Sequence, residues 1–97
     1  MAKGYWVANV EVKNLEEYKK YIAANAVPFG KFGAKFLVRA GQHQVREGHL
    51  NSRIVVIEFK DYATALACYD SPEYQEAMKL RKDHSVGNLA IVEGWEG

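Results

Sequence analysis

Apolar and polar residues alternate in several short stretches of the chain, and such alternation is typical of β-strands with one face in the core. In residues 4–12 the alternation separates two unlike faces. One of these faces carries Trp6, Ala8, Val10 and Val12. The run 53–60 is rich in branched residues and is predicted to lie centrally in a sheet. Further strands are predicted over residues 35–40 and 88–95.

Apolar residues at helical spacing predict a first helix between the first two strands. Asn14 precedes Glu17 by three positions, an arrangement that satisfies free backbone amides at a helix start. The helix is expected to extend to about Phe32, with a kink or an early break near Pro28, which lacks an amide donor. Gly33 suits the left-handed backbone that often follows a helix end.

A second helical region follows residue 60 and is predicted in two pieces. Asp61 is placed to cap the first piece, and Ser71 followed by Pro72 is placed to start the second. The first piece carries Tyr62, Leu66 and Tyr69. The second piece carries Tyr74, Ala77, Met78 and Arg81 on one side.

This order of elements predicts an α+β, ferredoxin-like βαββαβ fold, in which the helices cover one face of a four-stranded antiparallel sheet. The polar segment 42–52 is expected to extend a hairpin that turns near Glu47 and Gly48. The sheet face away from the helices would carry Tyr5, Val7, Asn9, Ile54, Val56 and Glu58. Because that face is partly apolar, a second copy is expected to cover it and close a barrel, which predicts a homodimer.

Size and composition favour one soluble domain. The chain has 97 residues, of which 48% are apolar and 26% charged, and a net charge of +1 gives no electrostatic reason to expect nucleic acid or a membrane surface as partner. Cys68 is the single cysteine, so an intrachain disulfide is excluded and a reducing, cytoplasmic location is expected. No apolar run approaches the length of a membrane span, and no signal peptide is expected.

Several motifs carry a resemblance to a known family. They are "GYWVANVEV", "KFGAKFLVRAG", "VVIEF", "YDSPEYQ" and "AIVEGW", and together they cover nearly the whole chain. On these motifs the sequence resembles the DUF1330 family, which implies one dimeric α+β barrel domain over residues 1–97. Family members typically have Arg-Gly-Gly where this chain has Arg39-Ala40-Gly41, so a backbone conformation that needs glycine at position 40 would be disfavoured.

The wider superfamily implied by this resemblance contains cofactor-free monooxygenases, haem-degrading enzymes, muconolactone isomerases and ligand-binding modules. Its haem-degrading members use an asparagine on the first strand with a tryptophan and a histidine on the second helical region. Asn9 matches the first role, but the segment 61–80 contains neither Trp nor His, and His84 lies beyond the expected place. No haem, and no other cofactor, is therefore predicted.

Six residues are candidates for a small-molecule site. Arg39, on a predicted strand face with Lys35 and Leu37, could clamp a carboxylate or an enolate, with a structural ion pair to Glu58 or Glu93 as the alternative. Glu58 projects from an apolar row and is a candidate base, with an ion pair to Arg39 or Arg53 as the alternative.

Tyr74 and Arg81 lie two helical turns apart and could line a pocket together, with an ordinary amphipathic helix as the alternative. Asn9 and Ser71 complete the predicted ligand-binding set. The tyrosines at positions 18, 21, 62 and 69 are expected to be core or rim aromatics.

No metal site is predicted. His43 and His49 flank the expected hairpin turn without a third ligand, and Cys68 is expected to be a small buried hydrophobic residue. The preferred hypothesis is a homodimer with a small-molecule pocket in each subunit. Its chemistry would be cofactor-free handling of a small carbonyl or aromatic acid, with Arg39, Glu58 and Tyr74 as catalytic residues. The alternative is a non-enzymatic ligand-binding or assembly module.

Overall fold

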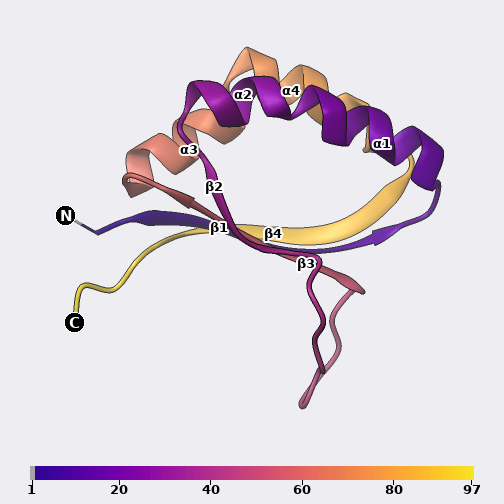
Figure 1. The fold of residues 1–97 in the computed structure, drawn as a ribbon, viewed down its shortest axis with the longest axis horizontal. Helices are drawn as coiled ribbons and strands as arrows, with labels where there is room; N and C mark the ends of the chain where they lie inside the picture. Colours follow the sequence, from indigo (N-terminus) through magenta and orange to yellow (C-terminus); the bar gives the residue numbers. More distant parts are fainter. Residues whose placement is uncertain (1) are drawn as a thin grey trace.

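One antiparallel sheet in the order β2-β3-β1-β4 carries all the helices on one of its faces (Figure 1). The computed structural model describes residues 2–97. Its strands are β1 (Gly4–Val12), β2 (Lys35–Arg39), β3 (Arg53–Phe59) and β4 (Ser85–Glu93). Its helices are α1 (Leu15–Ala24), α2 (Ala26–Lys31), α3 (Tyr62–Asp70) and α4 (Pro72–Lys79). The predicted α+β, ferredoxin-like fold is confirmed, with β3 beside β1 at the centre of the sheet.

The first helical region breaks where the sequence predicts. The Asn14 side chain accepts a hydrogen bond from the Glu17 amide at 3.2 Å and caps α1. The break lies at Asn25, three residues before Pro28, because proline cannot donate to the preceding turn and crowds it. Gly33 has φ +69°, so the left-handed residue expected after this region is confirmed.

The second helical region has the two predicted pieces and caps. Asp61 Oδ1 accepts from the Thr64 amide at 2.7 Å. The Ser71 hydroxyl accepts from the Tyr74 amide at 3.1 Å and donates to the Cys68 carbonyl at 2.7 Å, so it joins the end of α3 to the start of α4. This buried link fixes the direction of α4 and thereby the position of Tyr74.

The strand register divides the sheet into two faces. On the helix face, Trp6 lies opposite Ile57, and Val10 lies opposite Arg53. The other face, which no helix covers, is called the open face here (Figure 1). Its residues on β1 and β3 are Tyr5, Val7, Asn9, Ile54, Val56 and Glu58, as the alternation predicts.

β2 departs from the predicted alternation. A bulge between Phe36 and Val38 makes Leu37 an extra residue, so that Phe36 lies opposite Ile57 and Arg39 opposite Val55. Both partners belong to the helix face, and Arg39 therefore shares its face with Phe36 rather than with Lys35 and Leu37 as the alternation predicted. One inserted residue is enough to exchange the two faces of a strand.

β4 begins before the predicted start at residue 88. Its first residues, from Ser85 to Gly87, lack an apolar alternation, so the pattern did not indicate a strand. Gly87 lies opposite Val10, and a Cβ at this position would lie 2.7 Å from the Asn9 carbonyl oxygen. Glycine therefore allows a close approach of β4 to β1 here, and pairing with β1 determines the strand.

Ala40 adopts the backbone conformation that its replacement of glycine was expected to disfavour. Its φ is 57°, in the left-handed region, and its amide donates to the Ile54 carbonyl at 2.8 Å as the chain leaves β2. The corner is thus kept at the cost of strain around the alanine Cβ, which is of the order of 1–2 kcal/mol.

The Ala40→Gly variant is therefore expected to be more stable than the unaltered protein by about 1 kcal/mol. Urea unfolding followed by circular dichroism measures the difference. Ala67→Gly, in the exposed middle of α3, is the matched control and should lose about 1 kcal/mol, because there glycine only adds freedom to the unfolded chain. A loss of stability in both variants would contradict the strain at position 40.

Residues 40–52 form no strand ladder, so the predicted hairpin extension is wrong in its pairing. The segment is an arm that projects from the open-face side of the sheet, with its turn at the tip (Figure 1). Gly48 has φ +76°, which suits the turn expected at Glu47 and Gly48. Asn9 Oδ1 accepts from the Asn51 amide at 3.0 Å and ties the base of the arm to β1.

Candidate functional site

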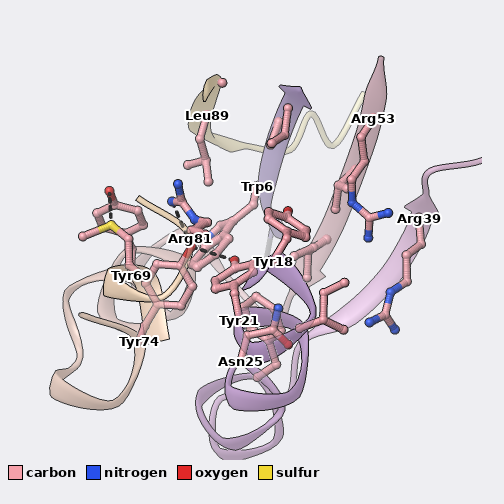
Figure 2. A pocket seen from close by; sticks show the side chains of 18 of the residues that line it. Trp6, Tyr18, Tyr21, Asn25, Arg39, Arg53, Tyr69, Tyr74, Arg81 and Leu89 are labelled. Atoms are coloured by element: carbon pink, nitrogen blue, oxygen red, sulfur yellow. Dashed lines mark hydrogen bonds between the residues drawn. The ribbon is translucent and has the colours of Figure 1, made fainter. Parts of the chain in front are cut away.

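A cavity of about 430 Å³ lies between the helices and the helix face of the sheet (Figure 2). We call it the helix-side cavity. Its floor comes from β1 and β3, with β4 residues such as Leu89 at one end, and its walls come from α1 and α4. The volume is in the range that holds a small organic molecule.

Aromatic rings form much of the lining of the helix-side cavity, and Trp6 contacts several of these rings. Trp6 is 2% exposed. Its ring centroid lies 4.9 Å from that of Tyr74 and 5.3 Å from that of Phe29, and both contacts are edge to face. Its indole Nε1 donates to the Ala65 carbonyl at 2.9 Å, which anchors the ring to α3. The other aromatic lining residues are Tyr18, Tyr21, Phe36 and Tyr69. These contacts make the cavity wall part of the hydrophobic core.

The charged residues of the lining are all cationic. They are Arg39, Arg53, Arg81 and Lys82, and no Asp or Glu lies among the lining residues. Within residues 2–97, no ion pair to any arginine is found. Arg53 and Arg81 are half-buried and Arg39 and Lys82 are exposed, so this set of cations attracts anions most strongly at the half-buried pair, where the protein screens less than water does.

Arg81, Tyr74 and Tyr21 form a hydrogen-bonded group at one side of the cavity (Figure 2). An Arg81 Nη donates to the Tyr74 hydroxyl at 3.2 Å, and the Tyr74 and Tyr21 hydroxyls lie 2.9 Å apart. The Arg81 guanidinium also lies 5.3 Å from the Tyr21 ring centroid. Burial, with help from Tyr21, raises the pKa of Tyr74 well above its ordinary value, against the opposing charge of Arg81. Tyr74 is thus a protonated hydrogen-bond donor at neutral pH.

Arg53 and Arg39 lie at the other side, beside Tyr18 (Figure 2). The Arg53 guanidinium is 5.8 Å from the Tyr18 ring centroid, and its buried Nε has no hydrogen-bond partner within the described residues. The Arg39 guanidinium is 4.2 Å from the Phe36 ring centroid and is exposed at the rim. Each guanidinium thus lies beside an aromatic ring, Arg53 also interacts with the Tyr18 hydroxyl, and neither is paired with a carboxylate of the described residues.

Asn25 adds a neutral polar group to the lining. It is buried at the junction of α1 and α2, where the helix break turns it toward the cavity (Figure 2). Among the hydrogen bonds of residues 2–97, none involves its side-chain amide. A bound molecule could satisfy that amide, which both donates and accepts.

Residues 3–95 match the model of the domain of unknown function DUF1330. The chain belongs to this family. The family predicted from the sequence motifs is therefore confirmed. No curated protein matches the sequence.

Solved structures similar to this DUF1330 protein share its fold. RPA0582, a protein of unknown function from Rhodopseudomonas palustris, has a TM-score of 0.75 at 18% identity, over 99% of this chain and 85% of that one. SnoaB, a cofactor-independent oxygenase from Streptomyces nogalater, has a TM-score of 0.65 at 14% identity, over 100% and 97%. A dimeric ferredoxin-like protein of unknown function from Jannaschia sp. CCS1 has a TM-score of 0.68 at 14% identity, over 94% and 98%. At these identities the likeness supports the fold alone.

The sheet divides the six residues predicted as a site in this DUF1330 protein. Arg39, Tyr74 and Arg81 line the helix-side cavity together. Asn9 and Glu58 point from the open face, where Asn9 accepts from Asn51 and the Tyr5 hydroxyl donates to Glu58 at 3.2 Å.

Ser71 lies in neither group, because both hydrogen bonds of its hydroxyl join α3 to α4. The structure therefore brings half of the predicted set together, from the strand bulge and from the broken helix.

Arg53, Asn25, Tyr18 and Tyr21 line the cavity but were not predicted as site residues. Arg53 follows from strand alternation, since it shares the face of Val55 and Ile57 and so points under the helices. Tyr18 and Tyr21 were expected as core aromatics, and they are buried residues of the core that also line the cavity. No sequence signal marks Asn25, whose orientation depends on the helix break.

The remaining reactive side chains lie elsewhere. Cys68 is buried as predicted, and burial, with Glu73 adding, raises the pKa of its thiol to about 12, which makes it unreactive. His43 and His49 lie on the exposed arm. Within residues 2–97 no group of three or more metal-ligating side chains occurs. The helices of that same range are all too short or too polar to cross a membrane.

Proposed function

We propose that this protein binds a small organic acid in the helix-side cavity. The observation that carries the proposal is the lining: four cationic side chains, aromatic walls and no carboxylate. Guanidinium groups bind carboxylates through paired hydrogen bonds, and the aromatic walls suit a planar or cyclic body. A ligand anion would also offset the mutual repulsion of the cations.

The ionisable groups of the lining favour binding over proton abstraction. They are arginines, one lysine and tyrosines, and burial raises the pKa of both Tyr18 and Tyr74. Tyr18 and Tyr74 therefore stay protonated at neutral pH and act as hydrogen-bond donors, while the cations stabilise negative charge. The raised pKa values keep the phenols of Tyr18 and Tyr74 neutral, and a carboxylic acid ligand is already ionised above about pH 6. The affinity of the protein for such an acid should therefore stay constant between about pH 6 and pH 9.

Phenylacetate and its amide, phenylacetamide, form a matched pair of probes for this proposal. The acid should raise the melting temperature of the protein, and the neutral amide of nearly the same shape should not, because a ligand stabilises the native state in proportion to its affinity. A thermal-shift screen of small aromatic and aliphatic acids, each with its amide, extends the comparison. Equal shifts from acids and amides, or no shift from any acid, would contradict an anion site.

A second candidate function is cofactor-free chemistry on a small carbonyl or aromatic acid in the same cavity. Arg39 and Arg81 would stabilise negative charge that develops on the substrate, and the protonated Tyr74 would donate a hydrogen bond to it. The fold shared with SnoaB, a cofactor-independent oxygenase, supports this candidate. Oxygen uptake in the presence of acids found by the screen distinguishes turnover from binding.

We also propose that the protein is a cytoplasmic homodimer formed through the open face. Val7, Val86 and Val92 lie on this face with 42% to 46% of their surface exposed in the single chain, a patch that a second copy would cover. The fold shared with a dimeric ferredoxin-like protein supports this arrangement. In it, Asn9 and Glu58 would lie at the interface. The buried free thiol of Cys68 is consistent with a reducing compartment.

The Val7→Glu variant should be monomeric, since a carboxylate at the centre of the open face would be buried without a partner in the dimer. Sedimentation velocity at micromolar concentration measures the change. Val27→Glu is the matched control, because Val27 is 64% exposed on α2, away from the open face, and its variant should stay dimeric. An unaltered protein that sediments as a monomer would contradict the proposed dimer.

A further inference from the structure

The cations of the helix-side cavity form two groups rather than one. Arg39 and Arg53 come from β2 and β3 and lie at one side, whereas Arg81 and Lys82 follow α4 and line the other side. Figure 2 shows the guanidinium groups of Arg39 and Arg53 apart from that of Arg81, with tyrosine rings between them.

A pair of aromatic rings separates the two groups. The Arg53 guanidinium lies 5.8 Å from the Tyr18 ring, the Tyr18 and Tyr21 rings lie 5.3 Å apart, and the Arg81 guanidinium lies 5.3 Å from the Tyr21 ring. Each guanidinium therefore lies within cation–π distance of its own tyrosine, at an end of this pair. A carboxylate bound at one end is too small to reach the other, because it would have to span both rings.

Each end carries a guanidinium that has no carboxylate partner within the described residues. The buried Nε of Arg53 has no partner within the described residues. Arg81 carries five N–H groups and interacts through them with the Tyr74 hydroxyl at 3.2 Å and with the Tyr21 hydroxyl, so donors remain for an acidic group. Because the lining holds no Asp or Glu, the two ends cannot both be neutralised from within the cavity.

We propose that the ligand of this cavity is a dianion with an acidic group at each end of a planar or cyclic, apolar body. The inference rests on the proposed binding of organic acids. One acidic group would bind Arg39 and Arg53, the other would bind Arg81 and Lys82, and the body would pack on the tyrosine pair and Trp6. A volume of about 430 Å³ is sufficient for one ring with two acidic arms.

Diacids of graded length and their monomethyl esters test this inference by isothermal titration calorimetry. The series is terephthalate, para-phenylenediacetate and para-phenylenediacrylate, and each ester keeps the shape of its diacid but has one charge fewer. We expect at least one diacid to bind about 10-fold more tightly than its own ester, the gain of one charged contact.

Two single variants assign the ends. Arg53→Met and Arg81→Met should each bring the affinity for that diacid close to the affinity of its ester. Each should change the affinity of the ester by less than about threefold, because a single acid can bind at the remaining end. Arg46→Met removes the same charge from the exposed arm and should alter neither affinity. Circular dichroism confirms that each variant is folded.

The possible results separate this inference from the proposed function. Equal affinity of every diacid and its ester would overturn the dianion while leaving a single-acid site. The same conclusion would follow if one arginine variant abolished all binding and the other had no effect. If neither diacids nor esters bind at millimolar concentration, the inference fails together with the proposed function.

Discussion

The double variant Arg53→Met/Arg81→Met should lose about 10- to 100-fold of its affinity for phenylacetate, the value of one or two hydrogen bonds to a charged group. Removing both guanidinium groups prevents the acid from binding at the opposite end of the cavity. Calorimetry or the thermal-shift response measures the loss. Methionine keeps much of the length of the arginine side chain, so the cavity should remain closed to bulk water.

The same variant should be as stable as the unaltered protein, or more stable by about 1 kcal/mol. Arg53 carries a buried Nε without a hydrogen-bond partner, and the clustered cations repel one another. Replacing the two arginines removes both of these unfavourable contributions to the free energy of folding. Loss of the hydrogen bond from Arg81 to Tyr74 lowers the stability by a similar amount.

Weaker binding at unchanged stability is the signature of residues kept for function. Arg46→Met/Lys60→Met removes the same charge from exposed positions and is the control for net charge. A loss of more than about 2 kcal/mol in the cavity variant would contradict this account, because it would show that the guanidinium groups hold the fold together.

Trp6→Ala should destabilise the protein by about 3–5 kcal/mol, the usual cost of removing a large buried ring. Trp6 is 2% exposed and touches Phe29 and Tyr74 edge to face, and its Nε1 bonds to the Ala65 carbonyl. Its loss removes these contacts and leaves a hole beside the helix-side cavity, so we also expect acid binding to disappear. Thermal and urea unfolding measure the stability.

Trp95→Ala provides the matched control for this substitution. Trp95 is 93% exposed, and its replacement should change stability by no more than about 0.5 kcal/mol. If the Trp6 variant lost less than about 1 kcal/mol, the aromatic cluster would not be the organising part of the core.

The fold could be predicted because local signals and the global pattern agree. Caps at Asn14, Asp61 and Ser71, the break before Pro28 and the alternation in β1 each depend on neighbouring residues, so the sequence displays them directly. The arm over residues 40–52 and the early start of β4 were missed. In both segments, strand formation depends on whether a strand distant in the sequence lies close enough to pair.

The site could be predicted only in part, because it is assembled from different elements. The contact of Tyr74 with Arg81 follows from helical spacing and is confirmed at 3.2 Å. Arg39 reaches the cavity through a bulge that no periodicity shows.

Glu58 was grouped with the cavity residues although its alternation with Ile54 and Val56 already placed it on the open face. Applying strand alternation consistently to each strand would have put Arg53 in the candidate set and separated Glu58 from it.

Tryptophan fluorescence tests the central claim, that organic acids bind in the helix-side cavity. The chain has two tryptophans, so Trp95→Phe leaves Trp6, in the floor of the cavity, as the single tryptophan emitter. Titration of this variant with phenylacetate should change the Trp6 emission and saturate at the concentrations that calorimetry gives for binding. The change should be lost when Arg53→Met/Arg81→Met is added. Calorimetric binding to saturation without any change in Trp6 emission would contradict the account, because the acid would then bind elsewhere.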